Sequence, residues 1–265
     1  MTALRLAVLS LLVSALALLV SASRTVFSNA DFSAAVTMTL LPDLTPGAPD
    51  KRTQAVLARL NSRLTADMLG NFDLFLYVSK SASGPLAQRM YVFRKQAGEL
   101  KPAYAWAAST GREKPEVNAL GRHVLTATPM GYYQLDPRRM YSRYHSVSWD
   151  QDMTSVLFFD WERAGRQTGL AIHAASNTDI AKLGSRASGG CVHLSPQDAA
   201  TLFELIQTRY RGAVPRFAYN DESRTSSNRG DFMRDRRGAL EMTPGYRVLV
   251  VLEDYGGEDD VAALF

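Results

Sequence analysis

The 265-residue sequence contains a single cysteine, Cys191, which excludes an intramolecular disulfide. It has no dense stripe of lysine and arginine with interleaved aromatics, so nucleic acid is not an expected partner despite the net charge of +4. With 18 glycines, 11 prolines and 46% apolar residues, it is neither a fibrous nor a disordered chain. These absences leave a folded protein with one large domain, alone or with appendages, and a lone thiol that needs an explanation.

Long hydrophobic runs are also scarce, and the clearest one lies near the amino terminus. Residues 6–20 follow Arg5 and are apolar except for two serines. This run is short for a bilayer span, and residues 21–23 supply the small side chains of a cleavage site. Residues 1–23 are therefore expected to be a secretory signal, either cleaved after Ser23 or retained as a membrane anchor. Both outcomes predict an exported protein of the periplasm or cell envelope.

Residues 24–71 are expected to form a linker followed by one short helical leader. The linker contains three prolines and a glycine before Asp50, a composition typical of connecting segments. From Asp50 to Leu69 apolar residues recur at helical spacing, and Gly70 stands where a helix cap is common. We expect the apolar side of this helix to pack on the following domain, rather than on a membrane or a partner.

The rest of the chain predicts a β-rich α+β fold. Ser195 begins a clear helix, because it offers a capping hydroxyl before a proline. Between residues 209 and 237 arginines outnumber acids, which predicts a long exposed loop ahead of a final strand and an acidic tail. The expected domains are residues 72–211 and a carboxyl-terminal part, 212–265. Apolar or alternating segments predict strands at 73–79, 88–95, 103–109, 131–135, 155–159, 169–174 and 246–252.

The candidate chemistry lies between His173 and Cys191. A thiol becomes a useful nucleophile when a neighbouring base favours the thiolate, and His173 ends the apolar strand 169–174. Cys191 follows two glycines and precedes the Ser195 helix. Gly190 allows a close backbone approach, and backbone N–H groups beside it can face a developing oxyanion.

These residues resemble the L,D-transpeptidase catalytic domain, also called the YkuD domain. The resemblance is carried by a strand-ending histidine, an interval of about eighteen residues, and a Ser-x-Gly-Cys motif before a helix. Upstream segments run in the family's order, and the resemblance spans roughly residues 72–211. The segments are Ser109-Thr110-Gly111, Thr128-Pro129-Met130-Gly131-Tyr132-Tyr133, Met140, Ser142, Tyr144, Met153, Phe158-Phe159 and Ile172-His173.

The resemblance implies a mixed β-sandwich with a few packed helices and a peptidoglycan acyltransferase activity. It implies that Cys191 is the nucleophile and His173 its general base, with Ser188, Gly190 and His193 near the substrate or oxyanion. The expected reaction releases D-alanine from a tetrapeptide stem and transfers the diaminopimelate acyl group to an amine. That amine belongs to a second stem or to a wall-anchored protein. No metal or organic cofactor is implied, and a monomer is expected.

Two departures and several alternatives accompany this interpretation. The family usually has histidine where Gly189 stands, and arginine or asparagine where His193 stands. Water as acceptor makes the protein an L,D-carboxypeptidase, and loss of activity leaves a wall-binding protein of the same fold. Cys191 alone is compatible with a buried structural thiol, and with His173 and His193 it is compatible with zinc binding. Papain-like and sortase-like arrangements disagree with the order of the residues along the chain.

Overall fold

The computed structural model describes residues 50–257. They belong to one compact unit. The expected signal peptide, the linker and the end of the acidic tail lie outside the described residues. Within the described range, no helix is long and apolar enough to cross a membrane.

A five-stranded mixed sheet forms one half of the fold. β1 (Leu74–Ser79) pairs in parallel with β17 (Val248–Glu253), and the other neighbouring strands of this sheet pair antiparallel. All six residues of β1 are buried, which explains why the segment reads as a continuous apolar run instead of an alternating one. The strand order is β3 (Glu99–Ala107), β2 (Arg89–Gln96), β1 (Leu74–Ser79), β17 (Val248–Glu253) and β6 (Gly131–Tyr133).

A second sheet of four strands carries the candidate site. β11 (Ala171–Ala174) and β12 (Val192–Leu194) are parallel. Residues 175–191 connect them and include the short helix η1 (Ile180–Lys182). β8 pairs antiparallel with both β11 and β7. The order is β12 (Val192–Leu194), β11 (Ala171–Ala174), β8 (Gln151–Phe159) and β7 (Leu135–Ser146).

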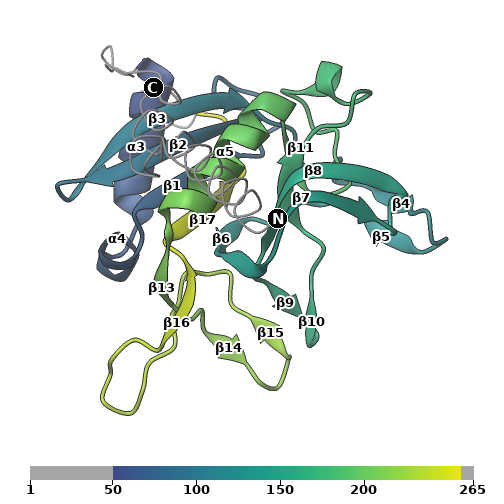
Figure 1. Ribbon diagram of the computed structural model, residues 1–265. Coiled ribbons are helices and arrows are strands. Elements are labelled where there is room, and N and C mark those ends of the chain that lie inside the picture. The colour runs from purple at the N-terminus through teal and green to yellow at the C-terminus, as the bar shows by residue number, and fades with distance from the viewer. Residues whose placement is uncertain (1–49, 258–265) are drawn as a thin grey trace, which may run out of the picture. The chain divides into compact units, whose positions relative to one another are not determined.

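Helix α5 (Pro196–Arg209) packs its buried side into the core that the two sheets share (Figure 1). Ser195 caps it, since the Ser195 hydroxyl accepts a hydrogen bond from the Asp198 N–H at 3.1 Å. The opposite face of the five-stranded sheet is covered by the leader helices, which contribute Val56, Leu60 and Met68 to a second apolar cluster. The prediction of a β-rich fold with few helices is confirmed.

The leader contains two helices, so the prediction of one helix closed by Gly70 was wrong. α3 (Lys51–Arg63) begins at the Asp50 cap, and α4 (Ala66–Asn71) follows after a break. The break occurs because the Thr65 hydroxyl accepts the Met68 N–H at 3.3 Å and starts a new helix. Gly70 lies inside α4.

The arginine-rich segment is more structured than its composition predicted. β13 (Arg211–Pro215) pairs with β16 (Met242–Tyr246), and β14 (Tyr219–Asn220) pairs with β15 (Thr225–Ser226). Backbone pairing therefore corrects the prediction of a single long loop. β17 begins at Val248, because Tyr246 belongs to β16.

Two further hairpins have no counterpart among the predicted strands, and a third was predicted only at residues 155–159 of its second strand. β7 and β8 form a long hairpin, β4 (Pro115–Val117) pairs with β5 (His123–Leu125), and β9 (Glu162–Arg163) pairs with β10 (Arg166–Gln167). The first two touch at their tips, where the Ala119 N–H donates to the Ser148 carbonyl at 3.0 Å. β7 escaped prediction because most of it is exposed or half-buried and it carries few regularly spaced apolar residues.

Candidate active site

The parallel pairing of β11 and β12 sets two imidazoles beside each other. His173 lies opposite His193 in the strand register, and their ring centroids are 4.5 Å apart. Both side chains are buried, and burial lowers the pKa of His173 to about 4 and that of His193 to about 3. Both rings are therefore neutral at pH 7.

One hydrogen bond fixes the tautomer of His173. Its Nδ1 lies 2.8 Å from the Ala174 carbonyl oxygen, which can only accept a hydrogen bond. Nδ1 therefore carries the proton, and Nε2 keeps a free lone pair. A neutral imidazole held in this way is a ready proton acceptor.

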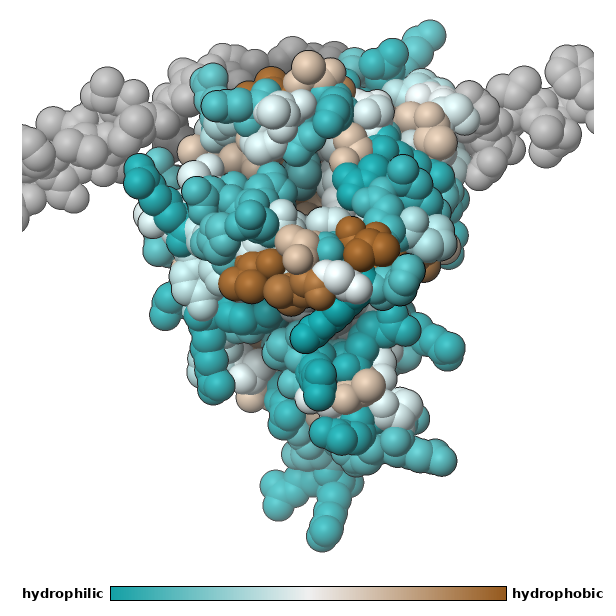
Figure 2. Space-filling view, turned by 90° about the vertical axis from the view of Figure 1, so that its right-hand side faces the viewer, coloured by the Kyte–Doolittle hydropathy of each residue, from teal (hydrophilic) through white to brown (hydrophobic). Residues whose placement is uncertain are grey.

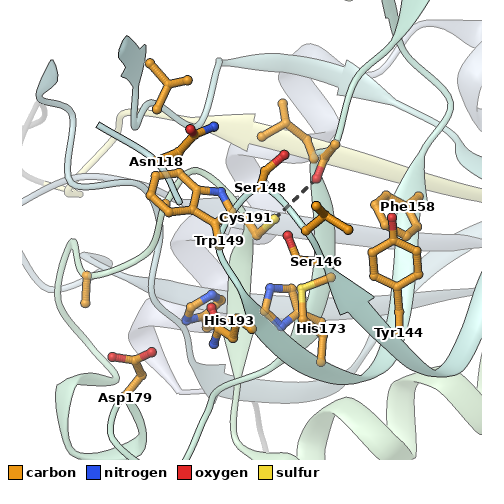
Figure 3. Close-up of a pocket in the computed structure, with 18 of the residues that line it drawn as sticks. Asn118, Tyr144, Ser146, Ser148, Trp149, Phe158, His173, Asp179, Cys191 and His193 are labelled. Atoms are coloured by element: carbon orange, nitrogen blue, oxygen red, sulfur yellow. Dashed lines mark hydrogen bonds between the residues drawn. The ribbon is translucent and has the colours of Figure 1, made fainter. Parts of the chain in front are cut away.

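Cys191 immediately precedes β12, and its side chain lines the same pocket as the two histidines (Figure 3). Its thiol donates to the Gly169 carbonyl oxygen at 3.5 Å, and burial raises the thiol pKa to about 11. The resting pair is thus a neutral thiol and a neutral imidazole. Nucleophilic chemistry here requires a proton to leave the sulfur during attack.

The backbone around the thiol, residues 187–191, is called the cysteine loop below. The Ser188 hydroxyl donates to the Cys191 carbonyl at 2.5 Å and accepts the Gly190 N–H at 3.0 Å. The Thr128 hydroxyl donates to the Gly190 carbonyl at 2.7 Å and accepts the Gly111 N–H at 2.8 Å. The Ser109-Thr110-Gly111 motif and the motif that begins at Thr128 therefore both contribute to the hydrogen bonds that hold the cysteine loop.

A buried lysine, Lys80, holds the backbone of Thr128 in place. The Lys80 ammonium donates to the Thr128 carbonyl oxygen at 2.7 Å and pairs with Glu113 at 2.7 Å. On the other side, Ser109 exchanges two backbone hydrogen bonds with His193, at 3.0 and 2.8 Å. Lys80 was not among the predicted site residues, because a single lysine in a loop gives no pattern.

A cavity of about 370 Å³ opens above the cysteine loop. Its opposite side is formed by the tips of the β4–β5 and β7–β8 hairpins, residues 117–123 and 146–151, called the hairpin wall below. Figure 2 shows apolar residues gathered on the face that carries these hairpins. The exposed apolar side chains of the two hairpins and their tips are Val117, Leu120, Leu125, Tyr144 and Val147.

The structure brings together three of the five predicted site residues in this cavity. Cys191, His173 and His193 line it, whereas Ser188 and Gly190 are not among the residues that line it. The Gly190 N–H, one of the expected oxyanion donors, is occupied by the Ser188 hydroxyl. The role of both residues in binding an oxyanion or substrate stays a prediction.

Trp149, which was not among the predicted site residues, lines the same cavity. A Cβ atom placed on Gly189 would lie 2.8 Å from Cε2 of the indole. Trp149 thus occupies the space next to the position where the resembling family usually has histidine. A lone tryptophan in the turn of a hairpin whose first strand was not predicted gave no signal for this contact.

No group of three or more His, Cys, Asp or Glu side chains within residues 50–257 is arranged to hold a metal ion. The cavity instead combines a thiol and two imidazoles with polar and apolar walls. This combination suits acyl transfer through a covalent thioester.

Comparison with known proteins gives a consistent family match. Residues 78–236 match the family model described as "YkuD: L,D-transpeptidase catalytic domain". No protein with a curated description matches the chain.

Three solved structures illustrate the likeness at low identity. An L,D-transpeptidase from Mycobacterium smegmatis is 12% identical, with a TM-score of 0.37, and the match covers 69% of this chain and 59% of that one. An L,D-transpeptidase from Xylanimonas cellulosilytica is 18% identical, with a TM-score of 0.37 and coverages of 74% and 68%. The helical cell shape determining protein Pgp2 from Campylobacter jejuni is 11% identical, with a TM-score of 0.36 and coverages of 77% and 56%.

Proposed function

The chain belongs to the L,D-transpeptidase catalytic domain (YkuD) family, and on this premise we propose that it is an exported peptidoglycan L,D-transpeptidase. The observation that carries the proposal is the placement of Cys191 and His173 in one cavity, with Nε2 of His173 free to accept a proton. The substrate is a tetrapeptide stem that ends in D-alanine.

The first half of the reaction forms a thioester. The Cys191 side chain leaves its hydrogen bond to Gly169, and its proton moves to Nε2 of His173 as sulfur attacks the carbonyl carbon of the diaminopimelate residue. A C–S bond forms, and the peptide C–N bond to D-alanine breaks. His173 returns the proton to the departing amine, so D-alanine leaves as a neutral amine.

The second half transfers the acyl group. An amine of a second stem, or of a wall-anchored protein, attacks the thioester carbon and gives its proton to His173. The C–S bond breaks, and the proton returns to the Cys191 sulfur. Apolar side chains on the cavity wall, among them Val124, Phe158 and Leu170, support transfer over hydrolysis because they limit the water near the thioester.

The test is mass spectrometry of purified disaccharide-tetrapeptide incubated with the protein and with a Cys191→Ala variant. A dimer that lacks one D-alanine, made by the unmodified protein alone, is expected. A tripeptide monomer in its place would identify an L,D-carboxypeptidase. Unchanged tetrapeptide, together with binding to intact sacculi, would point to a wall-binding protein of this fold.

A further inference from the structure

Trp149 stands over the cysteine loop with the nitrogen edge of its indole toward the backbone. An ideal Cβ on Gly189 would lie 2.8, 2.9 and 3.2 Å from Cε2, Cζ2 and Nε1 of that ring. Such contacts are possible because Gly189 has no side chain. Figure 3 shows the indole nitrogen turned toward the Cys191 sulfur.

Several contacts hold the ring in this place. The backbone N–H of Trp149 donates to the Ser146 carbonyl at 3.2 Å and closes the hairpin turn, and the neighbouring Ser148 carbonyl accepts the backbone N–H of Ala119. The Arg112 guanidinium lies 5.9 Å from the centre of the indole. Arg112 is itself fixed by two hydrogen bonds to Glu116 and one to the Ala187 carbonyl at 2.7 Å. The indole is therefore preorganised by both sides of the cavity.

The indole N–H is free to act on a ligand. Among the described residues it donates to no acceptor, while the Gly190 N–H is used by Ser188. An indole nitrogen is a donor only, so its partner must be an acceptor oxygen. A donor held beside a nucleophile contributes most where negative charge develops during the reaction.

We propose that the Trp149 indole N–H donates a hydrogen bond to the carbonyl oxygen of the acyl group that Cys191 attacks. Trp149 is then a catalytic donor on the oxyanion, supplied by the hairpin wall and admitted by Gly189. This role rests on the proposed acyl transfer. It extends that proposal by assigning a side chain from outside the cysteine loop to the transition state.

The experiment compares two reactions of the same thiol. With p-nitrophenyl acetate, sulfur adds to the ester carbonyl, an oxyanion forms, and p-nitrophenolate leaves as the thioester is made. With iodoacetamide, sulfur displaces iodide at a saturated carbon and no oxyanion forms. A Trp149→Phe variant keeps an aromatic ring and loses the N–H. We expect its ester acylation to fall about 100-fold, the range for loss of one oxyanion donor, with alkylation unchanged.

Gly189→Ala provides a second, independent variant. Its new Cβ meets the nitrogen edge of the indole, so the ring must move away and the acylation rate must fall. In a Trp149→Phe background the same change should have little further effect, because the donor is already absent. Trp106→Phe, a change on β3 in a ring stacked on Tyr104, is the matched control and should leave both rates unchanged.

Each outcome decides one question. If Trp149→Phe is acylated as fast as the wild-type protein, the donor role is overturned. It is also overturned if iodoacetamide labels Cys191 of the wild-type protein but the ester does not acylate it. Equal losses in both reactions also overturn it, because they indicate a disturbed thiol. An unmodified protein that is acylated by the ester but leaves tetrapeptide intact overturns the proposed function, and a selective loss in Trp149→Phe then still supports the donor.

Discussion

The cysteine loop and the hairpin wall face each other across one cavity, yet they are built in opposite ways. The loop rests on buried polar groups whose hydrogen bonds are nearly all satisfied, with Thr128 and Ser188 at the centre. The wall consists of hairpin tips whose apolar side chains are largely exposed, as Val147 is at 62%. Buried hydrogen bonds therefore fix the cysteine loop, which together with β11 and β12 is called the floor of the site below, whereas the hairpin wall is largely exposed.

The largest expected effect comes from the floor. Cys191→Ala should abolish D-alanine release, because alanine cannot form the thioester, and it should leave the thermal unfolding midpoint within a few degrees of the unmodified protein. Activity is measured by D-alanine release and stability by circular dichroism. Residual release at more than a trace would contradict the assignment of the nucleophile.

His173→Ala should lower kcat by about 10²- to 10⁴-fold, since a general base is lost. The matched control is His145→Ala, because His145 is exposed in β7 and pairs with Asp152 outside the cavity. Steady-state kinetics with the tetrapeptide provide the measurement. Equal losses in the two variants would mean that neither histidine is the base.

The buried imidazoles of His173 and His193 predict that the stability of the fold decreases in acid. The folded-state pKa values of about 4 and about 3 lie below the ordinary value of 6.5, so the unfolded chain binds more protons in between. Stability is therefore kept above about pH 6.5 and falls as the pH drops toward 4, by about 1.4 kcal/mol per pH unit for each imidazole. Urea unfolding between pH 4.5 and 7.5 measures this slope. His193→Gln should reduce it by about half, and an unchanged slope would assign the effect to other groups.

Thr128→Val tests the support of the cysteine loop. It leaves the Gly190 carbonyl and the Gly111 N–H without their partner, which should cost about 1–3 kcal/mol of stability and also lower kcat. Thr201→Val is the control, because the Thr201 hydroxyl lies exposed on α5 and bonds only to Gln197 within its own helix. Chemical denaturation of both variants measures the difference, and equal costs would remove the special role of Thr128.

The smallest effect is expected in the hairpin wall. Val147→Ser should change the free energy of unfolding by less than about 0.5 kcal/mol, because the side chain is mostly exposed. Since Val147 lines the cavity, KM for the tetrapeptide should rise about fourfold, the equivalent of one buried methylene group, with kcat unchanged. A large loss of stability would show that the wall is built like the floor.

The same contrast explains what the sequence could predict. Cys191 and His173 could be predicted as candidates, because a reactive thiol needs a base and because the motifs around them are short and contiguous; their roles stay predictions. The β1 and α5 segments were identifiable from a buried apolar run and from the Ser195 cap. Local signals were sufficient in each of these cases.

Signals were insufficient where the structure depends on contacts between distant segments. The contact between Trp149 and Gly189 requires the β7–β8 hairpin to fold back over the loop, and nothing near either residue reports it. The break between the two leader helices was missed because the apolar pattern continues through it, although the Thr65 hydroxyl caps a new helix there. Nothing in the sequence indicated that the Gly190 N–H is occupied, because its hydrogen bond to the Ser188 hydroxyl depends on how the loop folds.

The parallel pairing of β1 with β17 has a consequence for how the protein is made. Within residues 50–257 it joins the first strand to the last, and the adjoining ion pair of Asp73 and Arg247 spans 174 positions of the chain. Contacts of such long range slow folding, because a large loop must close before any of them forms. During synthesis the centre of the five-stranded sheet therefore stays incomplete until the final strand has been released, and the core closes only as a late, whole-chain event.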